Sequence, residues 1–165
     1  MKQRISVRAI IREDDKTLLL KRANGRPSIL GLFELPGGKL AYGEQPEDAL
    51  RRYLHDDAGL HIQTAQLFDA VTYIDQDDRD IQYAVIVYLV SLSNNHHELR
   101  LSANYSKYTW KKMSEMQHES ITDLTQLLLG IIEQEKITDK VIDVVAKNDV
   151  VNTSNTRVTI HSDGG

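Results

Sequence analysis

The stretch LPGGKLAYGEQPEDALRRYLHDDAGL, residues 35–60, contains the pattern that decides the fold. A Pro-Gly-Gly turn at 36–38 precedes an expected helix at 46–58, which has proline in its first turn and Gly59 at its end. The two glycines allow a sharp turn and a close approach of the backbone to a ligand. Because the helix presents its positive end toward that turn, the stretch predicts phosphate chemistry.

Strand patterns flank this segment on both sides. The acidic stretch 75–80 is expected to be a solvated hairpin turn, and residues 120–134 form an amphipathic pattern with Ser120 as the helix cap and Asp123 three residues later. Strands are expected at 4–11, 17–22, the short stretch before Pro36, 61–74, 81–92 and 107–113. This order predicts an α+β fold, an α/β/α sandwich with a mixed central sheet.

Composition limits the classes of function. The 165 residues are 41% hydrophobic and 27% charged, which is typical of a soluble globular protein with a sizeable core. A net charge of −4 provides no basic field for nucleic acid or an anionic membrane. No apolar run approaches the 18 or so residues of a membrane span, and the absence of cysteine excludes disulfides and thiolate metal sites. A cytoplasmic location is therefore expected.

The helix carries two neighbouring carboxylates, Asp56 and Asp57, with Tyr53 and Arg52 one turn before them. Residues three and four apart share a helix face, so these side chains are expected to lie near one another. Two adjacent carboxylates repel, and Mg²⁺ held by carboxylates and substrate phosphates is a natural partner. Glu44 would add a third acid. The alternative is a solvated acidic helix face, which is the common role of such pairs.

The spacing from Gly38 to Leu60 resembles the signature of the Nudix family. That signature is Gly, five residues, Glu, seven residues, then Arg-Glu-aliphatic-any-Glu-Glu-any-Gly-aliphatic. Gly38, Glu44 and Arg52 fill its first defined positions, and Leu54 and the Gly-Leu pair at 59–60 fill later ones. The segments LLLKR and FELPGGKL are also similar to the family, so the resemblance covers about residues 1–135.

The resemblance implies a Nudix-type sandwich and a Mg²⁺- or Mn²⁺-dependent hydrolase that cleaves a diphosphate linkage in a nucleoside triphosphate or related nucleotide. Its flanking segments look like those of MutT-type members, which implies a housecleaning role on oxidised nucleotides. The implied catalytic residues are Glu44, Arg52, Asp56 and Asp57. The implied metal ligands are the Gly38 carbonyl, Glu44, Asp56 and Asp57. The implied substrate contacts are Arg22, Phe33, Gly37 and Gly38.

The chain departs from the signature at three positions. Aspartates 56 and 57 replace glutamates and retract their oxygens by about 1.5 Å, the length of one C–C bond. Tyr53 replaces a glutamate that in the family is a metal ligand or a base, and a neutral phenol does neither well at pH 7. Loss of a general base typically costs about 10²–10⁴ in rate. The alternative function is therefore a catalytically weakened nucleotide-binding or sensor module attached to a nuclease domain.

A later loop offers one replacement acid. Glu98 lies in NNHHELRL, comparable to a loop in which some relatives carry a glutamate that serves as ligand or base. The alternative for Glu98 is an ordinary exposed loop residue. His96 and His97 are neighbours that point opposite ways in an extended segment, so we expect them to face solvent rather than a metal.

The composition changes after residue 136. Residues 1–136 are expected to form the Nudix domain, and 137–165 a helical extension, a polar linker and the start of a second domain. The last segment, VTIHSDGG, resembles the first strand of ribonuclease H domains, which places Asp163 at their first metal-binding aspartate. The alternative for this segment is a disordered terminal tail.

Overall fold

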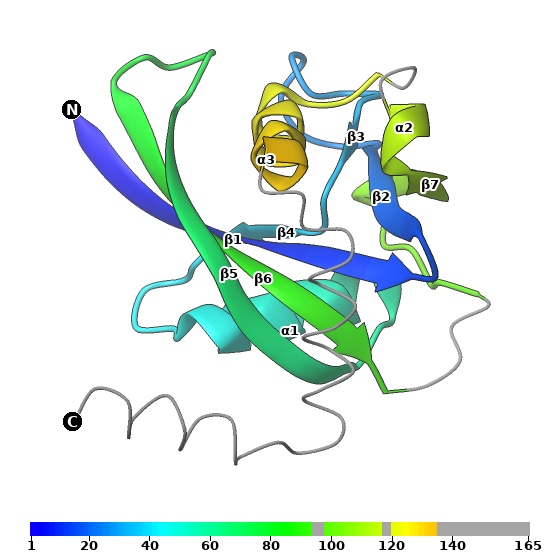
Figure 1. Ribbon diagram of the computed structural model, residues 1–165. Helices are drawn as coiled ribbons and strands as arrows, with labels where there is room; N and C mark the ends of the chain where they lie inside the picture. Colours follow the sequence, from blue (N-terminus) through cyan, green and yellow to red (C-terminus); the bar gives the residue numbers. More distant parts are fainter. Residues whose placement is uncertain (94–97, 117–119, 135–165) are drawn as a thin grey trace, which may run out of the picture. The chain divides into compact units, whose positions relative to one another are not determined.

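The computed structural model describes residues 1–93, 98–116 and 120–134, and Figure 1 shows their arrangement. The strands are β1 (Lys2–Glu13), β2 (Lys16–Arg22), β3 (Phe33–Glu34), β4 (Gly37–Lys39), β5 (Ile62–Ile74), β6 (Ile81–Leu92) and β7 (Tyr105–Lys112). The helices are α1 (Pro46–Ala58), α2 (Met113–Met116) and α3 (Asp123–Gln134). His96, His97, Asp163 and the whole extension 137–165 lie outside the described residues.

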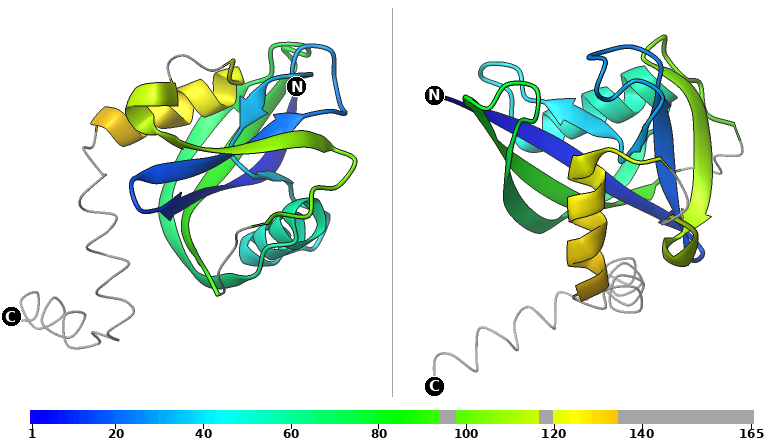
Figure 2. Two further views of the ribbon diagram at one scale, coloured as in Figure 1. Left: turned by 90° about the vertical axis from the view of Figure 1, so that its right-hand side faces the viewer. Right: turned by 90° about the horizontal axis from the view of Figure 1, so that it is seen from above.

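The strands form one mixed sheet with the order β3-β2-β1-β6-β5, in which β4 also pairs with β1 and β7 with β2. The β1–β6 pairing is parallel, and the other pairings are antiparallel. Helix α1 and the start of α3 lie on opposite sides of β1 in Figures 1 and 2. The predicted α+β sandwich with a mixed central sheet is therefore confirmed.

The chain divides into two compact units, Met1–Leu129 and Gly130–Gly165, and the sheet belongs to the first. None of the helices in the described ranges combines the length and the apolar character that crossing a membrane requires.

Strand β1 is the central element of the first unit. Its odd-numbered residues Val7, Ala9 and Ile11 lie in the main core cluster together with residues of α1. Its even-numbered residues Ser6 and Arg8 line a cavity, because successive side chains of a strand point to opposite faces. One strand thus separates the core from the functional surface.

Helix α1 has the predicted bounds. Pro46 occupies its first turn, and Gly59 ends it with φ 67°, in the left-handed region. The Gly59 N–H bonds to the His55 carbonyl at 2.9 Å, and the Leu60 N–H bonds to the Leu54 carbonyl at 3.0 Å, which satisfies carbonyls that the helix end leaves free. This end fixes the direction of the chain into β5.

The predicted cap of the last helix was wrong. Ser120 accepts a backbone hydrogen bond from Phe33 at 2.8 Å, and Ile121 forms a bridge with the same residue, so the chain is still extended there. Helix α3 begins at Asp123, and the Thr122 hydroxyl caps it by accepting the Thr125 N–H at 3.3 Å. Because residues 120–121 pair with β3, the cap of the helix lies at Thr122, two residues later than predicted.

Gly59→Ala should lower the free energy of unfolding by about 1–2 kcal/mol, because a Cβ is disfavoured in the left-handed region. The added Cβ would also lie 3.2 Å from the Arg100 Cβ. Gly130→Ala is the control, since nothing lies within 4 Å of its added Cβ and alanine favours a helix. Urea unfolding of both variants measures the difference, and equal stability of the two would contradict the expectation.

Candidate active site

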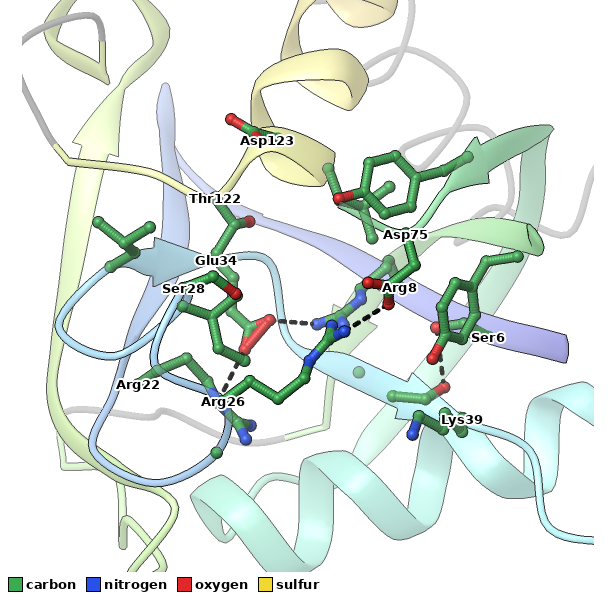
Figure 3. Close-up of a pocket in the computed structure, with 18 of the residues that line it drawn as sticks. Ser6, Arg8, Arg22, Arg26, Ser28, Glu34, Lys39, Asp75, Thr122 and Asp123 are labelled. Carbon is green, nitrogen blue, oxygen red and sulfur yellow. Dashed lines mark hydrogen bonds and ion pairs between the residues drawn. The ribbon is translucent and has the colours of Figure 1, made fainter. Parts of the chain in front are cut away.

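A cavity of about 490 Å³ opens beside the glycine turn (Figure 3). Its walls come from β1, the turn into β4, loop 23–32, one face of α1, the β5–β6 turn and the start of α3. This volume lies in the range of about 300–1,000 Å³ that small-molecule sites occupy. The cavity therefore gathers segments from nearly the whole first unit around one space.

The segment that begins with the bend at Pro36 and continues into β4, here called the glycine turn, is paired with β1, so Gly37 and Gly38 lie in a short strand rather than in the predicted turn. Strand β4 pairs Gly37 with Arg8 and Gly38 with Val7, and the Ser6 hydroxyl donates to the Gly38 carbonyl at 3.1 Å. Gly37 has φ 143°, and a Cβ there would lie 2.0 Å from the Val7 carbonyl oxygen. No other residue fits at this position. Gly37 and Gly38 both line the cavity, and their contact with a ligand stays a prediction.

Two arginines share one buried carboxylate at the cavity wall. Glu34 accepts a 2.8 Å hydrogen bond from Arg8 Nη1, and the Nε of Arg22 lies 3.4 Å from its other oxygen. The Tyr105 hydroxyl also donates to Glu34, and burial followed by the Glu34 charge raises the Tyr105 pKa. Burial lowers the pKa of Arg8, but the charge of Glu34 and its hydrogen bond help to outweigh burial. The pKa of Arg8 is raised overall, so Arg8 stays charged. The Nε of Arg8 is buried and has no hydrogen-bond partner among the described residues.

A second ion pair closes another wall. Arg26 Nη1 donates to Asp75 Oδ2 at 2.5 Å, and Asp75 Oδ1 accepts the N–H groups of Asp77 and Asp78. Ser28 also donates to Asp77. Burial raises the pKa of Asp75, yet the bonds from Arg26 and the two N–H groups outweigh it and hold the pKa low. The prediction of a wholly solvated acidic turn was wrong for Asp75, which is 0% exposed.

The two neighbouring aspartates of α1 diverge. Asp57 is 7% exposed, lines the cavity, and accepts hydrogen bonds from Ser102 Oγ at 2.8 Å and Asn104 Nδ2 at 3.1 Å. The Asp56 side chain is 63% exposed and lies 3.0 Å from His55 Nδ1. Adjacent helix residues point about 100° apart, so the pair does not share one face. Tyr53, one turn earlier, shares the face of Asp57 and also lines the cavity.

Glu44 is engaged by Arg52 rather than by the aspartates. Arg52 donates to both carboxylate oxygens, at 2.8 and 2.9 Å, and the Ala41 N–H donates at 2.8 Å. These bonds lower the pKa of Glu44 to about 2, chiefly through Arg52. The same guanidinium lies 4.4 Å from the centre of the Tyr53 ring. The pair joins the loop before α1 to the helix, and Glu44 is not one of the residues that line the cavity.

The expected cluster of three carboxylates does not form. Across residues 1–93, 98–116 and 120–134, no three His, Asp or Glu side chains lie so that they could hold one metal ion. Among the four expected ligands, Gly38 and Asp57 line the cavity. Tyr53 covers the glycine turn, since a Cβ on Gly38 would lie 2.3 Å from the Tyr53 Cζ. The residues present therefore do not fit an ion held by three protein carboxylates.

The other candidates separate into two groups. Arg22 lines the cavity. Phe33 is 6% exposed, lies outside the cavity lining, and packs with the Lys21 ammonium 5.8 Å from its ring centre. Glu98 is exposed and is not a lining residue either. Sequence patterns missed Arg8, Arg26, Glu34, Asp75 and Asn104, although an arginine within the apolar run VRAII was a signal for the first.

The family profile described as NUDIX domain matches residues 2–129. The chain belongs to the Nudix family. The Nudix domain is 26% identical over 137 residues to nucleoside triphosphatase NudI of Shigella flexneri, a match that covers 79% of this chain and 97% of that protein.

Solved structures resemble the Nudix domain as well. The MutT NUDIX hydrolase of Burkholderia pseudomallei has 26% identity and a TM-score of 0.68, over 79% of this chain and 98% of that chain. The MutT protein of Methanosarcina mazei has 21% identity and a TM-score of 0.70, over 81% and 95% of the two chains. The second likeness shows the fold alone.

Arg52→Ala should raise the pKa of Glu44 from about 2 toward its ordinary value of 4.5, because the largest cause of the low value is lost. In the unchanged domain, the stability that this pairing contributes is present above pH 4.5 and is lost as pH falls through about 2. NMR titration of the side-chain carboxyl carbon measures the pKa. Arg51→Ala is the control, because Arg51 donates to the Ile62 carbonyl instead. An unchanged pKa in Arg52→Ala would contradict the assignment.

Proposed function

We propose that this Nudix domain binds a nucleoside triphosphate or a related nucleotide in the cavity and hydrolyses its diphosphate linkage. The observation that carries the proposal is the position of Asp57, buried in the cavity wall beside a glycine turn and facing a space lined by arginines. The name of the NudI relative, nucleoside triphosphatase, supports the same class of substrate.

The phosphates would lie near the glycine turn. Lys39 directly follows the two glycines, and Lys39, Arg22 and Arg8 all line the cavity. Charge-assisted hydrogen bonds from guanidinium groups to phosphate are among the stronger polar contacts in proteins. The two glycines let the backbone approach the ligand without a side chain in the way.

The base would lie near two tyrosines. Tyr73 and Tyr83 are partners in the β5–β6 ladder, and both line the cavity. Ile29 and Leu124 add apolar surface to the same space. A flat aromatic base suits such a surface, because aromatic rings favour stacked or edge-to-face contacts.

In the proposed reaction, water attacks a phosphorus of the linkage, the P–O–P bond breaks, and a nucleoside monophosphate and pyrophosphate leave. Arginines held in place by Glu34 and Asp75 would stabilise the negative charge that develops on the phosphoryl oxygens. The substrate would be a complex of the nucleotide with Mg²⁺ or Mn²⁺. Such ions commonly bind through one or two carboxylates and the phosphates, which makes Asp57 the protein group suited to face the complex.

A second candidate function is nucleotide binding with little or no hydrolysis, as in a sensor module. The observation that favours it is Tyr53, which occupies the helix face beside Asp57 with a neutral phenol instead of an acid. The role of the extension 137–165 as the start of a nuclease domain stays a prediction, and so do action on oxidised nucleotides and a cytoplasmic location.

Asp57→Asn should lower kcat/KM for the best nucleoside triphosphate by about 10²-fold, a typical cost of losing one electrostatic contact to a transition state. The assay measures release of pyrophosphate with Mg²⁺ or Mn²⁺ and includes oxidised guanine nucleotides. Asp48→Asn, on the exposed first turn of the same helix, is the control and should leave kcat/KM within about twofold. Asp56→Asn should lose less than Asp57→Asn, because Asp56 points away from the cavity.

Each outcome separates the candidates. Turnover that falls in Asp57→Asn supports the hydrolase. Nucleotide binding by calorimetry without turnover selects the sensor module. A domain that neither binds nor hydrolyses any member of the panel overturns both.

A further inference from the structure

We infer that the described residues of the cavity hold no divalent ion on their own, that Tyr53 secures the glycine turn where an ion would otherwise do so, and that an ion enters only with the nucleotide. The last clause rests on the proposed function.

Position 53 is where a second carboxylate would meet Asp57. The two residues are one turn apart on α1, so they share a face, and both line the cavity beside Gly38. An acid at position 53 would place two carboxylates and the glycine turn around one point. Tyr53 instead places an aromatic ring there, and a neutral phenol is a poor ligand for a hard cation.

The ring is packed and bonded in that position. A Cβ on Gly38 would lie 2.3 Å from Tyr53 Cζ and 2.6 Å from its Cε1, so the ring lies directly against the Gly38 backbone. The Tyr53 hydroxyl donates to the Lys39 carbonyl at 2.8 Å. Arg52 lies over the ring and holds Glu44, which in turn accepts the Ala41 N–H. Direct contacts from helix α1 therefore hold residues 38–44 in place, and these contacts need no cation.

The three acids of the signature lie apart from one another, and the other cavity acids Glu34 and Asp75 are already paired with arginines. Glu44 is neutralised by Arg52, and Asp56 faces solvent beside His55. Asp57 receives two neutral donors, Ser102 and Asn104, on one oxygen. A single carboxylate holds Mg²⁺ weakly, because this ion keeps most of its waters until phosphates add further oxygens. Nucleotide phosphates would supply those oxygens, so metal affinity and nucleotide affinity should depend on each other.

The test uses the full chain and Mn²⁺, whose free concentration is measured by electron paramagnetic resonance. Without nucleotide, the unchanged protein should leave the free Mn²⁺ signal as it is in buffer. Tyr53→Glu should remove about one equivalent of Mn²⁺, and Tyr53→Glu with Asp57→Asn should lose that uptake. Tyr53→Phe is the matched control, because it keeps the ring, removes the bond to Lys39, and should take up no Mn²⁺.

A second measurement does not depend on any variant. The melting temperature of the unchanged protein should be the same in excess Mn²⁺ and in EDTA, and Mn²⁺ should raise it only when a non-hydrolysable triphosphate analogue is present. Uptake of Mn²⁺ by the unchanged protein without nucleotide, abolished in Asp57→Asn, would overturn the inference. A folded Tyr53→Glu protein that binds no Mn²⁺ would overturn the role of Tyr53.

Failure of the proposed function would look different. If calorimetry detects no nucleotide binding with or without Mn²⁺, the proposed function fails, whereas the result for Mn²⁺ alone still decides whether the domain holds an ion of its own.

Discussion

The backbone pairing between β1 and β4 is the constraint on which the candidate site depends. Gly37 passes so close to the Val7 carbonyl that only glycine fits, and the backbone of 37–39 is thereby fixed beside Ser6 and Arg8. The opposite face of β1 carries Val7, Ala9 and Ile11 into the core that packs against α1. The strand therefore couples the cavity to the hydrophobic core, and burial of apolar residues on one face positions polar groups on the other.

The fold could be predicted from the sequence because its signals are local. Alternating apolar residues marked the long strands, and Pro46 and Gly59 marked both ends of α1 correctly. The turn predicted at 36–38 was only partly right, because the bend lies at Pro36 and the two glycines already belong to strand β4. The cap of α3 failed, because Ser120 pairs with Phe33, a residue far away in the chain. Local chemistry at 120–123 contains no information about that partner.

The candidate site was less predictable from the sequence, because the positions of its polar groups depend on residues that are distant in the chain. Asp75 looked like one acid in a solvated turn, yet it is buried and accepts a hydrogen bond from Arg26, 49 residues away. Asp56 and Asp57 looked like a pair, yet Ser102 and Asn104 hold only the second against the cavity wall. The signature spacing identified the family, but it did not show that Arg52 takes Glu44 or that Tyr53 covers Gly38. The identity of a residue limits the kinds of group that its side chain can bond to. The tertiary fold determines which of those groups it contacts.

The bonds between loop 23–32 and the β5–β6 turn have a consequence for recognition. Arg26 and Ser28 contact Asp75 and Asp77, so bonds within the protein join two walls of the cavity. A molecule that enters does not have to order these segments, which lowers the entropic cost of association. An anionic ligand, however, competes with Asp75 for the Arg26 guanidinium. The shape of the cavity is therefore preorganised, but one of its cationic groups is already paired with a carboxylate of the protein. This combination favours ligands with several anionic groups over ligands with one.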